Sequence, residues 1–113
     1  MLSVGSVVSL KEDVKVKVMV IGYVPIYSKN GRRGYFDYCG CIFPEGIGND
    51  GTIPFNNEDV ANVLFKGYKS PEFNNFSELV KKQVKTLQLP RLSMVSHDTE
   101  DPVKKLLKER GMA

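Results

Sequence analysis

Single-residue alternation of valine is the clearest periodic signal in the chain. The alternating positions are Val14, Val16, Val18 and Val20. Because side chains two residues apart point to the same face of a β-strand, this spacing predicts a strand over residues 14–23. Lys15 and Lys17 make the other face polar at the start, while residues 19–23 are apolar on both faces. We therefore expect the strand to run from a half-exposed region into a doubly covered one.

Three further segments are predicted as strands, and turn-forming residues separate them. They are residues 3–10, 35–43 and 63–68. A hairpin loop is expected over residues 28–34, because Asn30-Gly31 readily adopts the positive φ of a tight turn. Gly40 lies inside a predicted strand, where the missing side chain favours the close approach of another backbone.

After residue 69 the apolar period changes from two to about 3.6 residues, which indicates a helix. The segment begins with Ser70-Pro71-Glu72, which supplies a capping serine, a proline at the first helical position and an acid in the first turn. The apolar stripe that follows consists of Phe73, Phe76, Leu79, Val80, Val84 and Leu87. These features predict an amphipathic helix over residues 71–87.

The order of elements indicates an α+β fold. Short, twisted antiparallel strands must bury one face, so we expect a small curled antiparallel β-sheet, an SH3-like half-open barrel, with one or two C-terminal α-helices. One helical turn over residues 58–62, capped by Asn57, is predicted before the last strand. The chain is expected to divide into two parts. Residues 1–88 form a β-sheet domain with its packed helix. Residues 89–113 form a linker and a basic C-terminal helix, which spans residues 101–110.

Charge is unevenly distributed between the two parts of the chain. Residues 1–80 hold eight Lys/Arg and nine Asp/Glu, a balance of −1, whereas residues 81–113 hold eight and four, a balance of +4. A basic tail fits an acidic protein partner or weak nucleic-acid affinity, and it equally fits lysines that solvate exposed helix faces. No apolar run approaches the roughly 18–20 residues that cross a bilayer, and the N-terminus lacks a secretory-signal pattern, so a cytoplasmic protein is expected.

Residue types that commonly carry catalysis or bind metals are few and scattered. Cys39 and Cys41 are expected to form a reduced, partly buried pair, because a strand places them at the outer limit of disulfide geometry. His97 is the single histidine, and it completes no zinc-binding spacing with the two cysteines. No glycine-rich phosphate loop is present. We therefore expect a protein that is not an enzyme and that has no metal or cofactor.

Two polar features leave alternatives open. Asp37, among aromatic residues, is either a lone acid at a sheet edge or a buried hydrogen-bonding residue. A cluster of basic and aromatic side chains follows the predicted hairpin: Lys29, Arg32, Arg33, Tyr35, Phe36 and Tyr38. Such a cluster is typical of small β-barrels that bind RNA, and also of basic hairpin tips that keep sheet edges soluble. The near-neutral charge of the sheet domain disfavours strong phosphate binding, so nucleic-acid binding stays an alternative.

Five blocks of sequence together resemble one protein family. They are VGSVVSLK at 4–11, VMVIGY at 18–23, FDYCGCIFPEG at 36–46, FNNEDV at 55–60 and VLFKGY at 63–68. Over residues 3–80 the chain resembles a small family of unknown function from Gram-positive bacteria, typically encoded near type VII secretion genes and the LXG class of secreted toxins. The resemblance implies a chaperone-like or targeting role in toxin export and brings no catalytic residues. The chain departs from the family at Asn57, where the family often has His.

A protein-binding role directs attention to two apolar surfaces. The first is the strand face and turn of Phe36, Tyr38, Ile42 and Glu45, and the second is the side of the 101–110 helix that carries Val103, Leu106 and Leu107. The second surface fits a groove on another protein. Ordinary core packing is the alternative for the first, and packing back on the same domain is the alternative for the second. The expected partner is the N-terminal domain of an LXG toxin or a small helical secretion protein, with a toxin-neutralising, immunity-like role as a further alternative.

Overall fold

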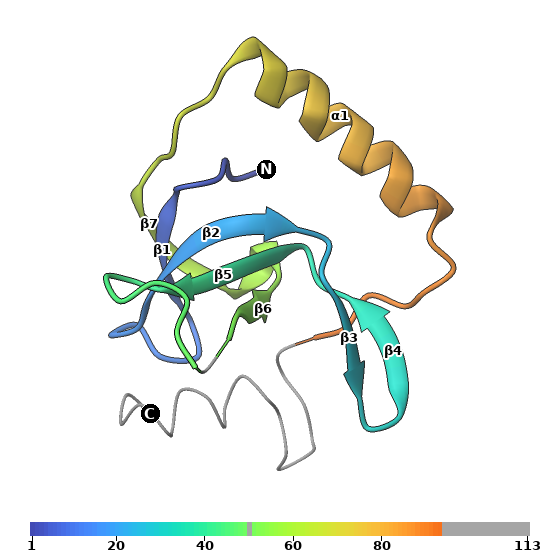
Figure 1. Ribbon diagram of the computed structural model, residues 1–113, viewed down its shortest axis with the longest axis horizontal. Coiled ribbons are helices and arrows are strands. Elements are labelled where there is room, and N and C mark those ends of the chain that lie inside the picture. Colours follow the sequence, from blue (N-terminus) through green and yellow to red (C-terminus); the bar gives the residue numbers. More distant parts are fainter. Residues whose placement is uncertain (50, 94–113) are drawn as a thin grey trace.

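The computed structural model describes residues 1–49 and 51–93 of the chain, which form strands, one 3₁₀ turn and one α-helix (Figure 1). In order they are β1 Val7–Leu10, β2 Lys17–Tyr23, β3 Ile26–Lys29, β4 Arg32–Tyr35, β5 Tyr38–Ile42, β6 Ile53–Phe55, the 3₁₀ turn Asn57–Asp59, β7 Val60–Phe65 and α1 Pro71–Thr86. The second helix predicted over residues 101–110 lies outside the described residues.

Five of the strands form one antiparallel sheet in the order β6-β5-β2-β1-β7. The long strand β2 is at its centre, paired with β1 on one side and β5 on the other. Strands β3 and β4 form a separate hairpin. The sheet curves and stays open, since β6 and β7 at its two edges do not pair with each other (Figure 1). The predicted α+β fold with a curled antiparallel sheet is confirmed.

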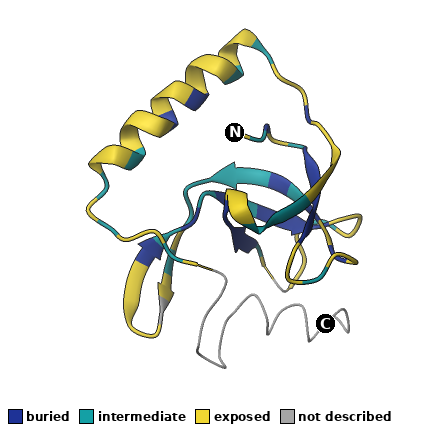
Figure 2. Cartoon of the chain, turned by 180° about the vertical axis from the view of Figure 1, so that it is seen from behind, coloured by how far each residue is buried: buried dark blue, intermediate teal, exposed yellow. Residues whose placement is uncertain are grey.

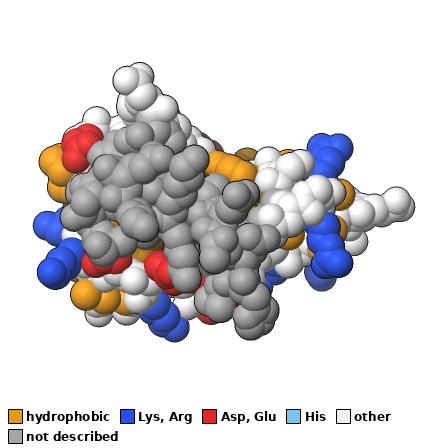
Figure 3. Space-filling model, turned by 90° about the horizontal axis from the view of Figure 1, so that it is seen from below, with side chains coloured by type: hydrophobic (Ala, Val, Ile, Leu, Met, Phe, Trp, Pro, Cys, Tyr) orange, Lys and Arg blue, Asp and Glu red, His pale blue; other side chains and the backbone are white. Residues whose placement is uncertain are grey.

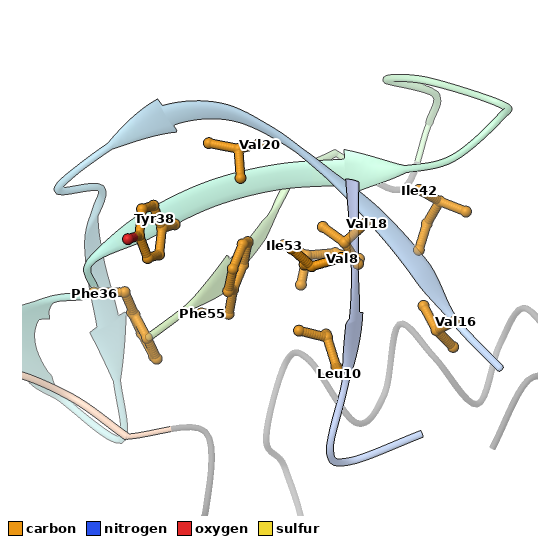
Figure 4. Close-up of a cluster of buried hydrophobic side chains, with 10 residues drawn as sticks. All are labelled: Val8, Leu10, Val16, Val18, Val20, Phe36, Tyr38, Ile42, Ile53 and Phe55. Atoms are coloured by element: carbon orange, nitrogen blue, oxygen red, sulfur yellow. The ribbon is translucent and has the colours of Figure 1, made fainter. Parts of the chain in front are cut away.

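The core lies inside the curve of the sheet, where side chains from four strands point toward one another (Figure 4). Its members are Val8, Leu10, Val16, Val18, Val20, Phe36, Tyr38, Ile42, Ile53 and Phe55. The predicted valine alternation is confirmed for Val18 and Val20 in β2 and for Val16 just before it, all fully buried, whereas Val14 is exposed. Burying each such side chain stabilises the fold by about 1.5–3 kcal/mol, so these strands carry most of the stability.

The segment between β2 and β5 differs from the prediction, which made it a simple hairpin loop. Pro25 has no backbone N–H for the β2 ladder, and Val24 turns the chain out of the sheet with a φ of 52°. The chain then forms its own hairpin, β3–β4, before β5 returns to pair with β2. The turn at Asn30-Gly31 has the two positive φ angles that its sequence predicts.

Helix α1 begins and ends within one residue of the predicted bounds. The Ser70 hydroxyl accepts a hydrogen bond from the backbone N–H of Phe73 at 3.1 Å, as expected of a capping serine. The helix stands apart from the sheet, with the N-terminal segment lying between α1 and β2 (Figure 1). Ser77 and Val80 are its buried residues, and most of its surface is exposed (Figure 2).

Candidate protein-binding site

A groove of about 570 Å³ lies between α1 and the end of β2, and we call it the α1 groove. Its wall on the sheet side is Val4, Ile21, Gly22, Tyr23, Val24 and Ile26, and its wall on the helix side is Phe76, Val80, Gln83, Val84 and Leu87. Gln83 and the Tyr23 hydroxyl are the polar side-chain groups in this lining. A largely apolar groove of this size accepts apolar side chains of a ligand or protein partner.

Tyr23 joins the helix to the sheet at one side of this groove. Its ring lies 5.6 Å from that of Phe76, 6.5 Å from that of Phe73 and 5.9 Å from that of Tyr38, measured between ring centroids. Its hydroxyl donates a hydrogen bond to the carbonyl oxygen of Leu2 at 2.6 Å. Burial, reinforced by the neighbouring Tyr38, raises the pKa of Tyr23. Tyr23 is therefore a neutral aromatic contact between α1 and the core.

The apolar stripe of α1 is only partly covered. Val80 is buried, and Phe73, Val84 and Leu87 are half-buried, but Phe76 is 45% exposed and Leu79 is 52% exposed. A helix that uses its whole apolar stripe for internal packing leaves polar residues on the outside. Large apolar side chains left half exposed beside an apolar groove are typical of a surface that another protein covers.

Lysines surround the other side of the same helix. A second groove, of about 550 Å³, is lined there by Lys81, Lys82 and Lys85 together with Glu78 and Asp37. The Lys81 ammonium lies 3.5 Å from the Glu78 carboxylate, and both side chains are exposed, so the pair contributes little to stability. The helix thus presents a half-exposed apolar stripe with a basic margin.

Arg91 fixes the chain that follows α1 to the sheet domain. Its guanidinium donates to the Asp37 carboxylate from Nε at 3.1 Å and from Nη2 at 2.7 Å, and to the Glu58 carboxylate from Nη1 at 2.9 Å. We call Arg91, Asp37 and Glu58 the Arg91 latch. Backbone bonds flank it, because the Tyr35 N–H donates to the Pro90 carbonyl and the Leu92 N–H donates to the Tyr35 carbonyl.

Asp37 is the centre of this latch and is not a lone acid at an edge. One of its carboxylate oxygens also accepts the backbone N–H of Asn57 at 2.9 Å. Burial alone would raise the pKa of Asp37, but the hydrogen bonds from Arg91 and Asn57 lower it below its ordinary value. The hydrogen bonds from Arg91 likewise lower the pKa of Glu58. The alternative of a hydrogen-bonded, partly buried Asp37 is therefore the one that the structure contains.

Asn56 is a buried residue that connects the Arg91 latch to the core by hydrogen bonds. It is fully buried, its side-chain oxygen accepts the Asp37 N–H at 2.9 Å, and its side-chain nitrogen donates to the Leu92 carbonyl at 2.7 Å. It also precedes the 3₁₀ turn, which is shorter than the predicted turn over residues 58–62 and begins one residue earlier. The side-chain oxygen of Asn57 accepts a hydrogen bond from the Tyr38 hydroxyl at 3.3 Å, so Asn57 has a structural role here.

The predicted binding residues lie in three different environments. Phe36, Tyr38 and Ile42 are core residues with at most 3% of their surface exposed, as the core alternative describes, and Tyr38 also lines the second groove. Glu45 is exposed in the turn after β5. The second predicted surface, Val103, Leu106 and Leu107, lies outside the described residues. The sequence does not predict the α1 groove or the Arg91 latch as sites, because the apolar stripe that includes Phe76 fits internal packing and Arg91 lies in the predicted linker.

The described residues contain no group of three or more His, Cys, Asp or Glu side chains placed to hold a metal ion. Cys39 and Cys41 are both free thiols, and burial raises the pKa of Cys41, which makes its thiolate scarce. No helix between residues 1 and 93 is long and apolar enough to span a membrane. On the face seen in Figure 3, the visible Lys and Arg side chains lie at opposite edges.

Comparison with known proteins places the chain in a family. No curated protein and no solved structure matches it. A family model described as a domain of unknown function, DUF4176, matches residues 1–76, which include the whole sheet and the first residues of α1. Because this match covers more than half of the 113 residues, the chain belongs to the DUF4176 family.

Proposed function

We propose that this protein is a non-enzymatic, protein-binding accessory of toxin export, a chaperone-like or targeting factor for LXG toxins that leave the cell through type VII secretion. It acts in the cytoplasm and receives an amphipathic helix of the toxin's N-terminal domain in the α1 groove. The observation that carries this proposal is the apolar groove bordered by the half-exposed stripe of α1. The link to toxin export rests on the sequence resemblance described above.

A helix is the occupant that best suits this groove. One side of the groove is itself a helix with Phe76, Val80 and Val84 spaced along one face. A second helix with apolar residues at positions i, i+3 or i+4, and i+7 packs against such a face by inserting side chains between them. Burial of the exposed half of Phe76 and of Leu79 would together contribute about 1.5–3 kcal/mol before the entropy cost of association.

The basic margin of α1 determines the polar side of the partner helix. Lys81, Lys82 and Lys85 lie beside the apolar stripe, with Glu78 as the acid that accompanies them on the helix. Acidic residues that flank the apolar stripe of the partner would meet these lysines. Such complementarity increases the rate of association and selects the partner more than it adds affinity.

Co-expression with an LXG toxin N-terminal domain, or with a small helical secretion protein, tests the proposal. We expect the full-length chain to copurify with one of them as a stable complex. Phe76→Asp is expected to abolish copurification, because it places a charge in the apolar groove. Asn75→Asp, which adds the same charge at the adjacent exposed residue, is the matched control and is expected to retain the complex.

Two results would contradict the proposal. One is the absence of a stable complex with any of these proteins, and the other is an equal effect of the two aspartate variants. An assay of cell survival and toxin export separates the related roles. Survival of toxin-producing cells with unchanged export would indicate an immunity-like protein, whereas loss of export on deletion indicates a chaperone or targeting factor.

A further inference from the structure

The two edges of the sheet differ in how they are protected from pairing with another strand. Edge strand β6 has three residues, contains Pro54 and is buried. Edge strand β7 has six residues, no proline and no charged residue. Natural proteins usually protect a sheet edge by shortening it or by adding proline or charge, and β6 shows two of these devices.

The second half of β7 is apolar and exposed. Val63, Leu64 and Phe65 are all exposed, and successive residues of a strand alternate between the two faces. On one side β7 pairs with β1, and among the described residues no strand pairs with its other side. Two register shifts in the β1–β7 ladder twist the strand, but they place no charge on it.

The charges at the two ends of β7 have opposite signs. Glu58 and Asp59 precede the strand, and Lys66 and Lys69 follow it. At the acidic end the acids Asp37, Glu58 and Asp59 outnumber Arg91 by three to one. The Lys11 N–H donates to the Asp59 carbonyl, which brings Lys11 and the turn that contains Glu12 and Asp13 to the same end, where acids still outnumber Arg91 and Lys11.

We propose that β7 pairs antiparallel with β7 of a second copy of this chain, so that one sheet continues through a symmetric dimer. An antiparallel arrangement about a two-fold axis near the middle of β7 places the acidic end of each copy beside Lys66 of the other. A parallel arrangement would place like charges together, which is destabilising. The charge pattern is therefore complementary to itself, which favours a second copy over an unrelated strand.

Most of the proposed partner site lies away from the edge strand. Ile26 of β3, which lines the α1 groove, is across the sheet from β7 (Figure 1), whereas Val4 at the groove packs against Gly67, two residues after β7. Two α1 grooves would then be present in each dimer. Because one strand pair with its flanking side chains is a small interface, we expect dimerisation to depend on protein concentration.

Sedimentation equilibrium of the full-length protein over a wide concentration range tests this proposal. We expect a monomer–dimer equilibrium that Leu64→Lys shifts to monomer, because each copy then places a charge on the edge. Leu79→Lys is the matched control, since Leu64 is 51% exposed and Leu79 is 52% exposed. Leu79→Lys is expected to remain dimeric and to lose the partner that binds α1. Leu64→Lys therefore tests the dimer and Leu79→Lys tests the proposed function, so failure of one proposal is distinguishable from failure of the other.

A charge exchange tests the antiparallel arrangement without changing the apolar strand. Lys66→Glu places acid against acid in both contacts of the dimer, and Glu58→Lys places base against base, so each variant alone is expected to dimerise at least about tenfold more weakly. An equimolar mixture of the two variants restores both contacts and is expected to form a heterodimer. Glu58→Gln removes the negative charge that pairs with Arg91 but adds no positive charge. It therefore controls for the loss of the contact between Glu58 and Arg91.

Three results would overturn the dimer. They are a chain that stays monomeric at every concentration, a dimer that Leu64→Lys leaves intact, and a mixture of the charge variants that associates no better than either variant alone. Circular dichroism of each variant verifies that the sheet is folded before its association is measured.

Discussion

The sheet and helix α1 both have amphipathic sequences, yet they use their apolar residues differently. In the sheet, the valines of β2 are fully buried among residues of β1, β5 and β6. In α1, Phe76 and Leu79 are about half exposed beside an apolar groove. Apolar periodicity therefore identifies an element and its apolar face, while the surrounding elements decide whether that face is core or is left for another molecule.

The difference arises from how each region is held in place. The strands are fixed by ladders and by the core, whereas α1 is held by its two ends and, between them, by the ring of Tyr23 and the buried Val80. Before α1, Gly67 is buried against the backbone of Val4 and Ser6, where an added Cβ would clash. After α1, the Arg91 latch and Leu92 attach the chain to the sheet domain. A helix anchored at its ends can keep its apolar stripe partly open.

The largest expected effect is in the sheet. Phe55→Ala should lower the free energy of unfolding by about 3–5 kcal/mol, because Phe55 is fully buried and its ring stacks 5.2 Å from that of Tyr38. Phe76→Ala in α1 should lower it by about 1 kcal/mol or less, since half of that side chain is already in water. Urea denaturation measures both values, and equal losses would contradict the distinction between the two regions.

The anchor at the end of α1 gives the next effect. In Gly34→Ala the new Cβ would lie 2.5 Å from Cγ of Leu92 and 2.6 Å from the Pro90 carbonyl oxygen, so residues 90–92 must move. We expect a loss of about 1–3 kcal/mol and faster hydrogen exchange at the Leu92 amide. Gly22→Ala is the control, because its Cβ meets Cβ of Cys39 at an ordinary 3.9 Å. An unchanged Leu92 amide would show that the segment is not held as described.

Arg91→Met should cost about 1–2 kcal/mol at neutral pH, because it removes charged hydrogen bonds from a partly exposed site. The pKa values of Asp37 and Glu58 are lowered in the folded state, so their contribution is present above the unfolded values near 4 and is lost as pH falls through the folded values. Thermal unfolding from pH 7 to pH 2 should therefore show the two proteins converging in acid. A difference that persists at pH 2 would mean that Arg91 acts through packing instead.

The smallest effect on stability is expected at Leu79. Leu79→Asp should change the free energy of unfolding by no more than about 0.5 kcal/mol, because the side chain is 52% exposed and lies outside the core. The same variant should lose the proposed partner. Isothermal titration calorimetry with the toxin domain, alongside urea denaturation, measures the two properties. A large loss of stability would show that Leu79 stabilises the fold, and would contradict its assignment to the partner-binding surface.

Much of the fold could be predicted from local sequence, because periodicity and capping are local properties. The alternation of Val16, Val18 and Val20, the Asn30-Gly31 turn and the Ser70 cap each depend on residues close in the chain. The separate β3–β4 hairpin was missed because the exit at Val24 requires a positive φ that valine rarely adopts.

The site could be predicted much less well, because it depends on contacts between distant residues. Arg91 meets Asp37 across 54 positions of sequence and Glu58 across 33, and no local pattern marks such a pairing. Phe36, Tyr38 and Phe76 are all apolar and near aromatic neighbours, so sequence alone did not separate the two that are buried from the one that is half exposed. Whether an apolar face is buried depends on the elements that pack over it, and these elements come from distant parts of the chain.

Amide hydrogen exchange of the full-length protein, alone and with the LXG toxin N-terminal domain, measures directly whether α1 is the surface that a partner covers. We expect α1 amides in the free protein to exchange faster than those of β2 and β5. The toxin domain should slow exchange in α1 and at the end of β2 that lines the groove, and leave the rest of the sheet unchanged. Protection of α1 equal to that of the sheet in the free protein, or no change in α1 when the domain is added, would contradict this expectation.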